Sequence, residues 1–219
     1  GVYKRQQVGI IASILLGYWA LLNIEIEGAY VLELGKYAGG NIVTYFDNII
    51  LGDNHMWKPV NVEAGYVLGW EPEGLLSTIP AIATCLLGVL AGAWIKKDLE
   101  LLEKIVGLFA VGALLTAISL LWNLVFPFNK GLWSSSYVLY AGGIALMSTG
   151  FCMWIMDFKG YSKLAKPFVI FGSNATVAYL MAELCSSLSW FIQVGNQSLN
   201  QYLAGGINSF IPYAKIASH

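Results

Sequence analysis

The sequence is short of charge, and this shortage excludes most classes of soluble protein. Only 11% of the 219 residues are charged, whereas 57% are hydrophobic, and soluble domains usually carry charge on about a quarter of their residues. The formal net charge is −1, and neither a basic run nor a stripe of basic and aromatic residues is present, so we expect no nucleic-acid partner. This composition is typical of an integral membrane protein.

Cysteine and histidine are also scarce, which argues against a metal site. The three cysteines, Cys85, Cys152 and Cys185, all lie inside apolar runs, where a free cysteine behaves as a small apolar residue. The two histidines, His55 and His219, form no ligand spacing with a cysteine. We therefore predict that the chain binds no metal.

The sequence contains long apolar runs instead. Five of them are long enough, or nearly so, to cross a hydrocarbon layer of about 30 Å as a helix. They cover residues 9–24, 75–95, 105–128, 132–156 and 167–194. A soluble all-α bundle would need a polar stripe along each helix, and the second run has almost no polar residues. The sequence thus predicts an all-α, polytopic membrane helix bundle of about five transmembrane helices.

Lysine and arginine are divided unequally between the two sides that these runs define. Eight of the twelve lie before the first run, between the second and third, or between the fourth and fifth: Lys4, Arg5, Lys96, Lys97, Lys104, Lys159, Lys163 and Lys166. Because basic residues are enriched in cytoplasmic loops, we predict that this side is cytoplasmic. The long loop 25–74, which carries eight of the thirteen acidic residues, then lies on the other side.

The loop 25–74 is too long to be a simple connection, and its aromatic content favours an ordered structure. Four large apolar residues within it recur at helical spacing: Ile42, Phe46, Ile49 and Ile50. This spacing predicts a short amphipathic helix over residues 42–51, either on the membrane surface or against the bundle. Gly52 is suited to end that helix.

A ridge of small residues marks the second apolar run. Thr84, Gly88 and Gly92 recur every four residues and therefore lie on one face of a helix. Small residues let a neighbouring helix approach closely in a membrane. We expect this ridge to pack against another helix.

The fifth run has a polar face that includes Tyr179 and Glu183. Glu183 lies near the middle of the run, where a carboxyl group is costly unless it is paired, protonated or in a wet cavity. We therefore take Asn174, Tyr179 and Glu183 as candidates for the lining of an interior cavity. A neutral Glu183, bonded to a neighbouring helix purely for assembly, is the alternative.

Both ends of the chain are unusual for a complete membrane protein. An initiator Met is absent, and the polar hexapeptide 1–6 directly precedes the first apolar run; we interpret this hexapeptide as a non-native junction. Residues 207–217 are moderately apolar, but the chain stops before they could form a span. We therefore expect a carboxy-terminal fragment that forms a single membrane domain.

Five motifs follow one another over about residues 9–183. They are GDNHMW at residues 52–57, WEPEGLLSTIPAI at 70–82, PFNKGLWSSSYV at 127–138, DFKG at 157–160 and FGSNA at 171–175. In its order, spacing and membrane context, this series resembles the heparan-α-glucosaminide N-acetyltransferase family and its bacterial relatives. One departure is Glu71, which stands where the family usually has Asp and keeps the charge.

The resemblance implies a transmembrane acyltransferase that uses acetyl-CoA from the cytoplasmic side as its co-substrate. The acetyl group would pass to the amine of a glucosamine-type sugar on the outer side. The resemblance also implies a catalytic histidine upstream of the residues present, so we assign no catalytic residue and do not give that role to His55. Candidates for contact with the sugar are Asp53, His55, Glu71, Glu73, Lys130 and Trp133.

Two other functions stay open. An amino-sugar or oligosaccharide permease on the same scaffold would use the polar face around Glu183, and a non-catalytic membrane scaffold would need no site. The expected partners are the lipid bilayer and an amino-sugar or oligosaccharide acceptor, and a homodimer is left open. The short form of the loop 25–74 favours a bacterial inner membrane, in which this loop is periplasmic.

Overall fold

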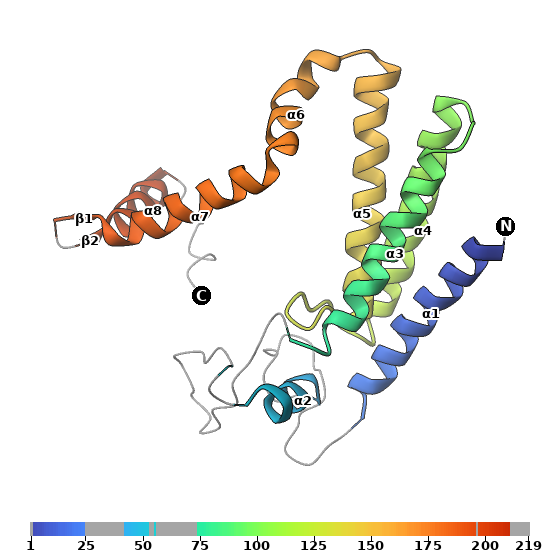
Figure 1. Ribbon diagram of the computed structural model, residues 1–219, viewed down its shortest axis with the longest axis horizontal. Helices are drawn as coiled ribbons and strands as arrows, with labels where there is room; N and C mark the ends of the chain where they lie inside the picture. The colour runs from blue at the N-terminus through green and yellow to red at the C-terminus, as the bar shows by residue number, and fades with distance from the viewer. Residues whose placement is uncertain (1, 25–41, 53–54, 56–73, 196, 211–219) are drawn as a thin grey trace. The chain divides into compact units, whose positions relative to one another are not determined.

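The computed structural model describes residues 2–24, 42–52, 55, 74–195 and 197–210, which form two compact units (Figure 1). The first unit is Gly1–Gly160 and the second is Tyr161–His219. Nearly all of the described residues are helical. Three helices are long and apolar enough to cross a membrane, or four if one bent pair counts as a single span. The predicted all-α, multi-pass membrane bundle is confirmed.

The first unit contains the three long apolar helices. They are α3 (Thr78–Ile95), α4 (Leu101–Asn123) and α5 (Ser135–Met153), the last continued by the π-helix η2 (Trp154–Phe158). They lie within a few residues of the predicted runs 75–95, 105–128 and 132–156. Helices α4 and α5 are antiparallel neighbours, and α3 lies beside them (Figure 1).

The first predicted run corresponds to α1 (Val2–Leu22), which packs against α3 and α5. It is not among the three helices that pass the length and hydropathy criteria for a span, because its first two turns carry Lys4, Arg5 and two glutamines. Helix α1 includes residues 2–6. The interpretation of residues 1–6 as a non-native junction stays a prediction.

The closest helix approach is between α4 and α5, and it uses glycines. A Cβ placed on Gly143 would meet the backbone oxygen of Gly112 at 2.7 Å, so neither position has room for a side chain. The predicted ridge on α3 behaves differently, because a Cβ on Gly88 or Gly92 would meet no atom within 4 Å. The prediction that this ridge packs against another helix stays a prediction, whereas close packing through glycines is present between α4 and α5.

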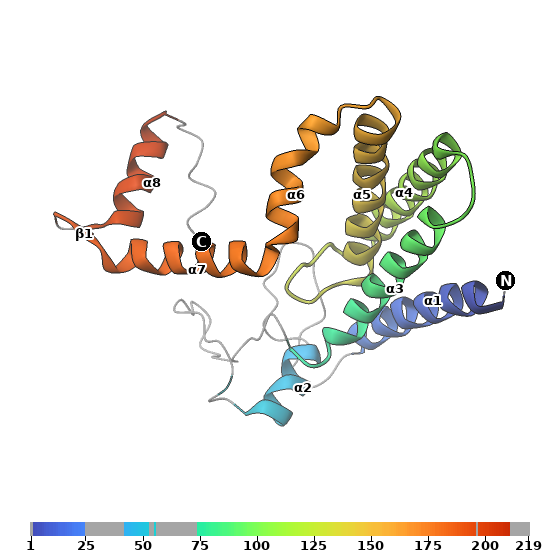
Figure 2. The same ribbon diagram turned by 45° about the horizontal axis from the view of Figure 1, so that its top comes forward.

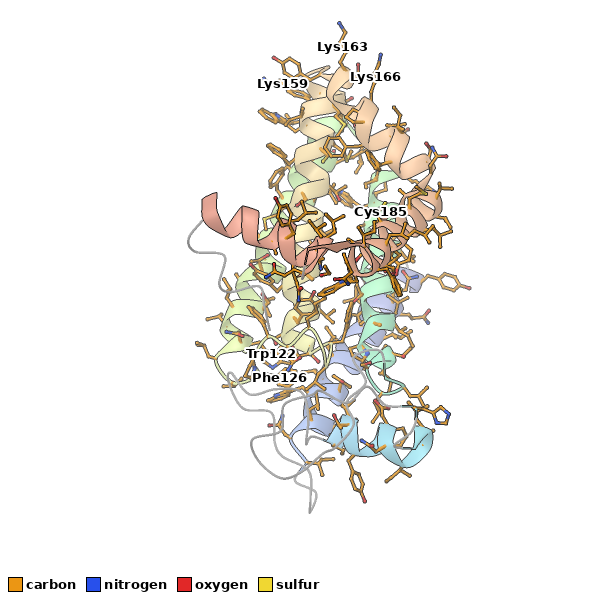
Figure 3. The ribbon with its side chains drawn as sticks, turned by 90° about the vertical axis from the view of Figure 1, so that its left-hand side faces the viewer. Trp122, Phe126, Lys159, Lys163, Lys166 and Cys185 are labelled. Atoms are coloured by element: carbon orange, nitrogen blue, oxygen red, sulfur yellow. The ribbon has the colours of Figure 1, made fainter. Side chains whose placement is uncertain are left out.

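The two ends of the first unit differ in composition. At one end, the start of α1, the α3–α4 connection and the end of η2 carry lysines or arginine; we call it the lysine end. At the other end lie the α4–α5 connection, helix α2 and the first turn of α3 (Figure 1); we call it the hairpin end. Figure 3 shows Trp122 and Phe126 at the hairpin end and Lys159 at the opposite end.

Helix α2 (Ile42–Leu51) confirms the predicted amphipathic helix at the same residues. Gly52 ends it with a positive φ of 74°, and its N–H donates to the Asn48 carbonyl at 2.9 Å. Glycine adopts this conformation without the steric cost of a Cβ. Ile42 and Val43 pack into a core cluster with Tyr18 and Leu22 of α1 and with Phe126 and Leu132 of the α4–α5 connection.

The second unit begins with the 3-10 turn η3 (Ser162–Leu164) and continues with α6 (Ala165–Ser173) and α7 (Ala175–Phe191). A short antiparallel hairpin follows, with two residues in each strand: β1 (Gln193–Val194) and β2 (Gln197–Ser198). It leads into α8 (Leu199–Phe210). Within the unit, α6 and α7 meet at an angle of 85° (Figure 2).

The continuous helix predicted over 167–194 is therefore two helices. The break lies at Asn174, whose φ of −121° and ψ of 31° are not helical. Its side-chain amide donates to the Ile170 carbonyl at 3.0 Å and to the Ser173 hydroxyl at 3.2 Å. Asparagine competes with helical backbone bonds in this way, and an apolar run by itself contains no sign of such a bend.

Candidate functional site

The α4–α5 connection at the hairpin end is built around Ser134, the N-cap of α5. Its buried hydroxyl oxygen accepts from the backbone N–H of Asn129 at 3.0 Å and of Tyr137 at 3.4 Å. It also donates to the Pro127 carbonyl at 3.0 Å, as does the Ser136 hydroxyl at 3.3 Å. Serine is favoured at this position because its oxygen satisfies the otherwise unpaired N–H groups of the first helical turn. The result is a closed, internally bonded turn.

Two buried hydrogen bonds attach this turn to α1, far away in sequence. The Tyr18 hydroxyl donates to the Leu132 carbonyl at 2.7 Å, and the Ser135 hydroxyl donates to the Leu15 carbonyl at 2.7 Å. Tyr18 is 2% exposed and Ser135 is fully buried. Each bond pairs a buried hydroxyl that would be costly to leave unsatisfied in an apolar interior, so together they set the position of the turn relative to α1.

Trp133 occupies a strained position in the same turn. Its φ is +53°, the one non-glycine residue with positive φ in the described part of the chain, and such a conformation costs about 1–3 kcal/mol. Its indole N–H donates to the Thr84 hydroxyl of α3 at 3.1 Å, and its backbone N–H donates to the Lys130 carbonyl at 3.2 Å. The ring packs edge-on against Tyr137, with centroids 5.6 Å apart. These contacts hold the half-buried indole between α3 and α5.

The structure brings two of the predicted sugar-contact residues together, because Lys130 and Trp133 belong to one turn. Lys130 is exposed, and Trp133, three residues later, is half-buried. An ammonium group and an aromatic surface carried by a rigid turn suit the binding of a polar ligand with an apolar face. The remaining carboxylate candidates, Asp53, Glu71 and Glu73, lie outside the described residues.

Asp47 of α2 is one of the eight acidic residues of the loop 25–74. The sequence predicted no role for it. Its side chain is 1% exposed, and one carboxylate oxygen accepts from the backbone N–H groups of Leu75 at 3.1 Å and Leu76 at 3.4 Å. The carboxylate thus lies at the amino end of α3, where a negative charge is favourable. The signal in the sequence was the single charged residue of a largely apolar helix.

His55 lies one turn beyond α2 and is exposed. Its Nδ1 is 2.8 Å from the Leu51 carbonyl, which makes Nδ1 the protonated nitrogen and the histidine a cap on the last turn of α2. Among the described residues, no group of three or more His, Cys, Asp or Glu side chains is placed to hold a metal ion.

The three interior candidates belong to the second unit. Asn174 stands at the break between α6 and α7, and Tyr179 and Glu183 follow in α7. Tyr179 and Glu183 are five and nine residues beyond Asn174, and both side chains are exposed within the unit. Their placement in a cavity stays a prediction.

No protein-family model matches the sequence. The heparan-alpha-glucosaminide N-acetyltransferase of Mus musculus is 30% identical over 164 residues, which is 69% of this chain and 25% of that protein. The protein of the same name from Homo sapiens is 30% identical over 192 residues, 80% of this chain and 28% of the human protein. The chain thus aligns with only about a quarter of the length of these relatives. It is a membrane-bundle relative of the heparan-alpha-glucosaminide N-acetyltransferases, as its motif series predicted.

Proposed function

We propose that the chain is part of a transmembrane acyltransferase. It would transfer acetyl from cytoplasmic acetyl-CoA to the amine of a glucosamine-type sugar on the opposite side of the membrane. The observation that carries this proposal is the 30% identity to two N-acetyltransferases over 69% and 80% of the chain. The membrane bundle supports it, because the donor and the acceptor would lie on different sides.

The division of charge supports the orientation in this proposal. In the described part of the first unit, six of the seven lysines and arginines lie toward the lysine end: Lys4, Arg5, Lys96, Lys97, Lys104 and Lys159. The seventh, Lys130, lies at the hairpin end. Positive residues favour the cytoplasmic side, so the lysine end would face the cytoplasm and the hairpin end would face a bacterial periplasm.

The hairpin end would bind the sugar rather than carry out the chemistry. Acetyl transfer to an amine forms an N–C bond at the thioester carbonyl and breaks its C–S bond, so that CoA leaves as its thiol, and a base carries the proton that the nitrogen loses. The acetyl group comes from acetyl-CoA when it is bound. The residues of this chain would orient the acceptor, with the Lys130 ammonium donating to a sugar oxygen and the Trp133 ring packing against the sugar ring. The bonds to Thr84 and to the Lys130 carbonyl would keep that ring in place.

Transfer of labelled acetyl from acetyl-CoA to a glucosamine-terminated oligosaccharide tests the proposal in membranes that contain the protein. Trp133→Phe removes the bond to Thr84 but keeps an aromatic ring, and we expect a rise in KM for the acceptor. Trp94→Phe is the matched control, because the Trp94 indole donates to the Lys104 carbonyl at 3.1 Å toward the lysine end. No label transfer to any amino sugar would refute the proposal.

One observation favours the permease alternative, namely the 85° break between α6 and α7. Transporters often bind their substrates where a membrane helix is broken, and Glu183 follows this break in α7. If the chain is a permease, proteoliposomes that contain it should take up an amino sugar without acetyl-CoA. Uptake would fall in Glu183→Gln but not in Glu100→Gln, a control at the N-cap of α4. Acetylation without uptake would exclude it.

A further inference from the structure

Helix α2 has its polarity reversed relative to a helix that packs on a protein core and faces water. Its polar residues Thr44 and Asp47 are 2% and 1% exposed. Every exposed side chain on the helix is large and apolar: Tyr45, Phe46, Ile49 and Ile50, with Ile49 65% exposed. A water-facing helix normally places its polar residues outward. The outer face of α2 therefore suits an apolar environment.

The position of α2 indicates what that environment is. The helix lies across the hairpin end of the first unit, whereas the long helices α3, α4 and α5 run along it (Figure 3). Its buried face packs on Tyr18 and Leu22 of α1 and on the connection after α4. If the long helices cross the bilayer, a helix that lies across their end is roughly parallel to the membrane plane. An interfacial amphipathic helix has this orientation.

Helix α2 also contacts the segment that leads into a candidate span. Asp47 binds the backbone N–H groups of Leu75 and Leu76, in the turn that immediately precedes α3, so α2 is in direct contact with the segment that enters this helix. Leu75 and Ile79, at the start of α3, are 48% and 39% exposed. Exposed apolar residues on a membrane span face lipid. The same lipid would reach α2.

We propose that α2 is embedded in the bilayer leaflet at the hairpin end, with Tyr45, Phe46, Ile49 and Ile50 in the boundary between headgroups and acyl chains. Two of the four are aromatic, as is common at this depth. The helix carries one charge, Asp47, and that charge is buried against the bundle, so no exposed charge opposes insertion. The occupant of this face is lipid, and the inference does not depend on the proposed acetyl transfer.

The proposal assigns α2 a mechanical role as well. A helix held in the leaflet cannot tilt freely, and Asp47 joins it to the turn that precedes α3 through two N–H groups. Leu132, in the turn after α4, packs in the same core cluster as Ile42 and Val43 of α2.

Spin-label accessibility in proteoliposomes tests this placement directly. The chain is reconstituted with Cys85, Cys152 and Cys185 replaced by alanine, and a nitroxide is attached at Ile49→Cys or Ile50→Cys. Collision of the label with oxygen, which concentrates in lipid, is compared with collision with a charged nickel chelate, which stays in water. A label at His55→Cys, exposed one turn beyond the helix, is the matched control.

Lipid embedding predicts that oxygen collisions exceed nickel collisions at both positions in α2 and that the ratio is reversed at residue 55. High nickel accessibility at residues 49 and 50 would place the helix in water and overturn the proposal. Low accessibility to both reagents would show that protein covers the face, either a second copy or another segment of the chain, and would overturn it equally. Two exposed positions are used because either variant alone could perturb the fold.

Discussion

The two ends of the first unit are held together by different kinds of contact. At the hairpin end, buried side chains bond to backbone groups far away in sequence, as Tyr18 does to Leu132 and Ser135 to Leu15. At the lysine end, the side-chain contacts join residues much closer in sequence and are partly exposed; the Trp94 indole, for example, donates to the Lys104 carbonyl ten residues away. The Lys97 ammonium lies 4.0 Å from the Trp94 ring centre, and the Lys159 ammonium lies 5.3 Å from that of Trp154.

The difference in contacts between the two ends indicates which end has the more strongly fixed geometry. Local cation–π contacts are weak at exposed sites and suit side chains that reach toward a membrane–water boundary. Buried bonds between distant segments resist distortion, since breaking one leaves an unpaired polar group in an apolar interior. The hairpin end is therefore the end at which buried bonds fix distant segments to one another, and it carries the turn that we propose as a sugar site.

The largest effect is expected for Asp47→Ala, which removes a buried charged acceptor from two N–H groups at the start of α3. Hydrogen bonds to charged groups contribute roughly 1.5–3 kcal/mol each, so the free energy of unfolding should fall by about 3 kcal/mol. Denaturation in mixed micelles measures it. Asp98→Ala, at an exposed position of the α3–α4 connection, should change it by less than about 0.5 kcal/mol. Equal effects would remove the distinction between the two ends.

A smaller loss is expected for Tyr18→Phe, which deletes only the hydroxyl that donates to Leu132. The Leu132 carbonyl would lose its buried partner, at a cost of about 1.5 kcal/mol. The control is Tyr3→Phe, because Tyr3 is 83% exposed near the start of α1. The thermal unfolding midpoint in detergent should fall for the first variant only. An unchanged midpoint in Tyr18→Phe would show that this bond does not fix the turn.

The smallest of these effects is expected for Ser135→Ala, at about 1 kcal/mol, the net value of one buried neutral hydrogen bond. Thr149→Ala is a matched control on the same helix α5, since its hydroxyl donates to Ala145 at 2.8 Å but is exposed. Proteolysis rates in micelles compare the two, because cleavage follows the open population. Faster cleavage in Thr149→Ala than in Ser135→Ala would reverse the comparison.

Some local features of the fold could be predicted from the sequence, and one local feature could not. The α2 helix and its end at Gly52 followed from local spacing and one glycine, and the long spans followed from apolar runs. The bend at Asn174 did not, because the asparagine stands inside a continuous apolar run and bonds to a backbone carbonyl that any residue could provide.

In the candidate site, the sequence indicated residues that lie close together in the chain and missed those with distant partners. Lys130 and Trp133 were found because they belong to one short motif, and the structure places them in one turn. The roles of Asp47 and Tyr18 were missed because their partners are 28 and 114 residues away in sequence. The ridge at Gly88 and Gly92 was predicted to pack, but its pattern alone cannot say which helix is adjacent.

Labelling of single cysteines in intact cells tests the orientation on which the account depends. In a background without Cys85, Cys152 and Cys185, a membrane-impermeant maleimide is applied to Lys130→Cys at the hairpin end and to Lys97→Cys at the lysine end, both exposed positions. The account predicts that Lys130→Cys reacts in intact cells or spheroplasts and that Lys97→Cys reacts only after the inner membrane is opened. The reverse pattern would place the proposed sugar site on the cytoplasmic side and contradict the account.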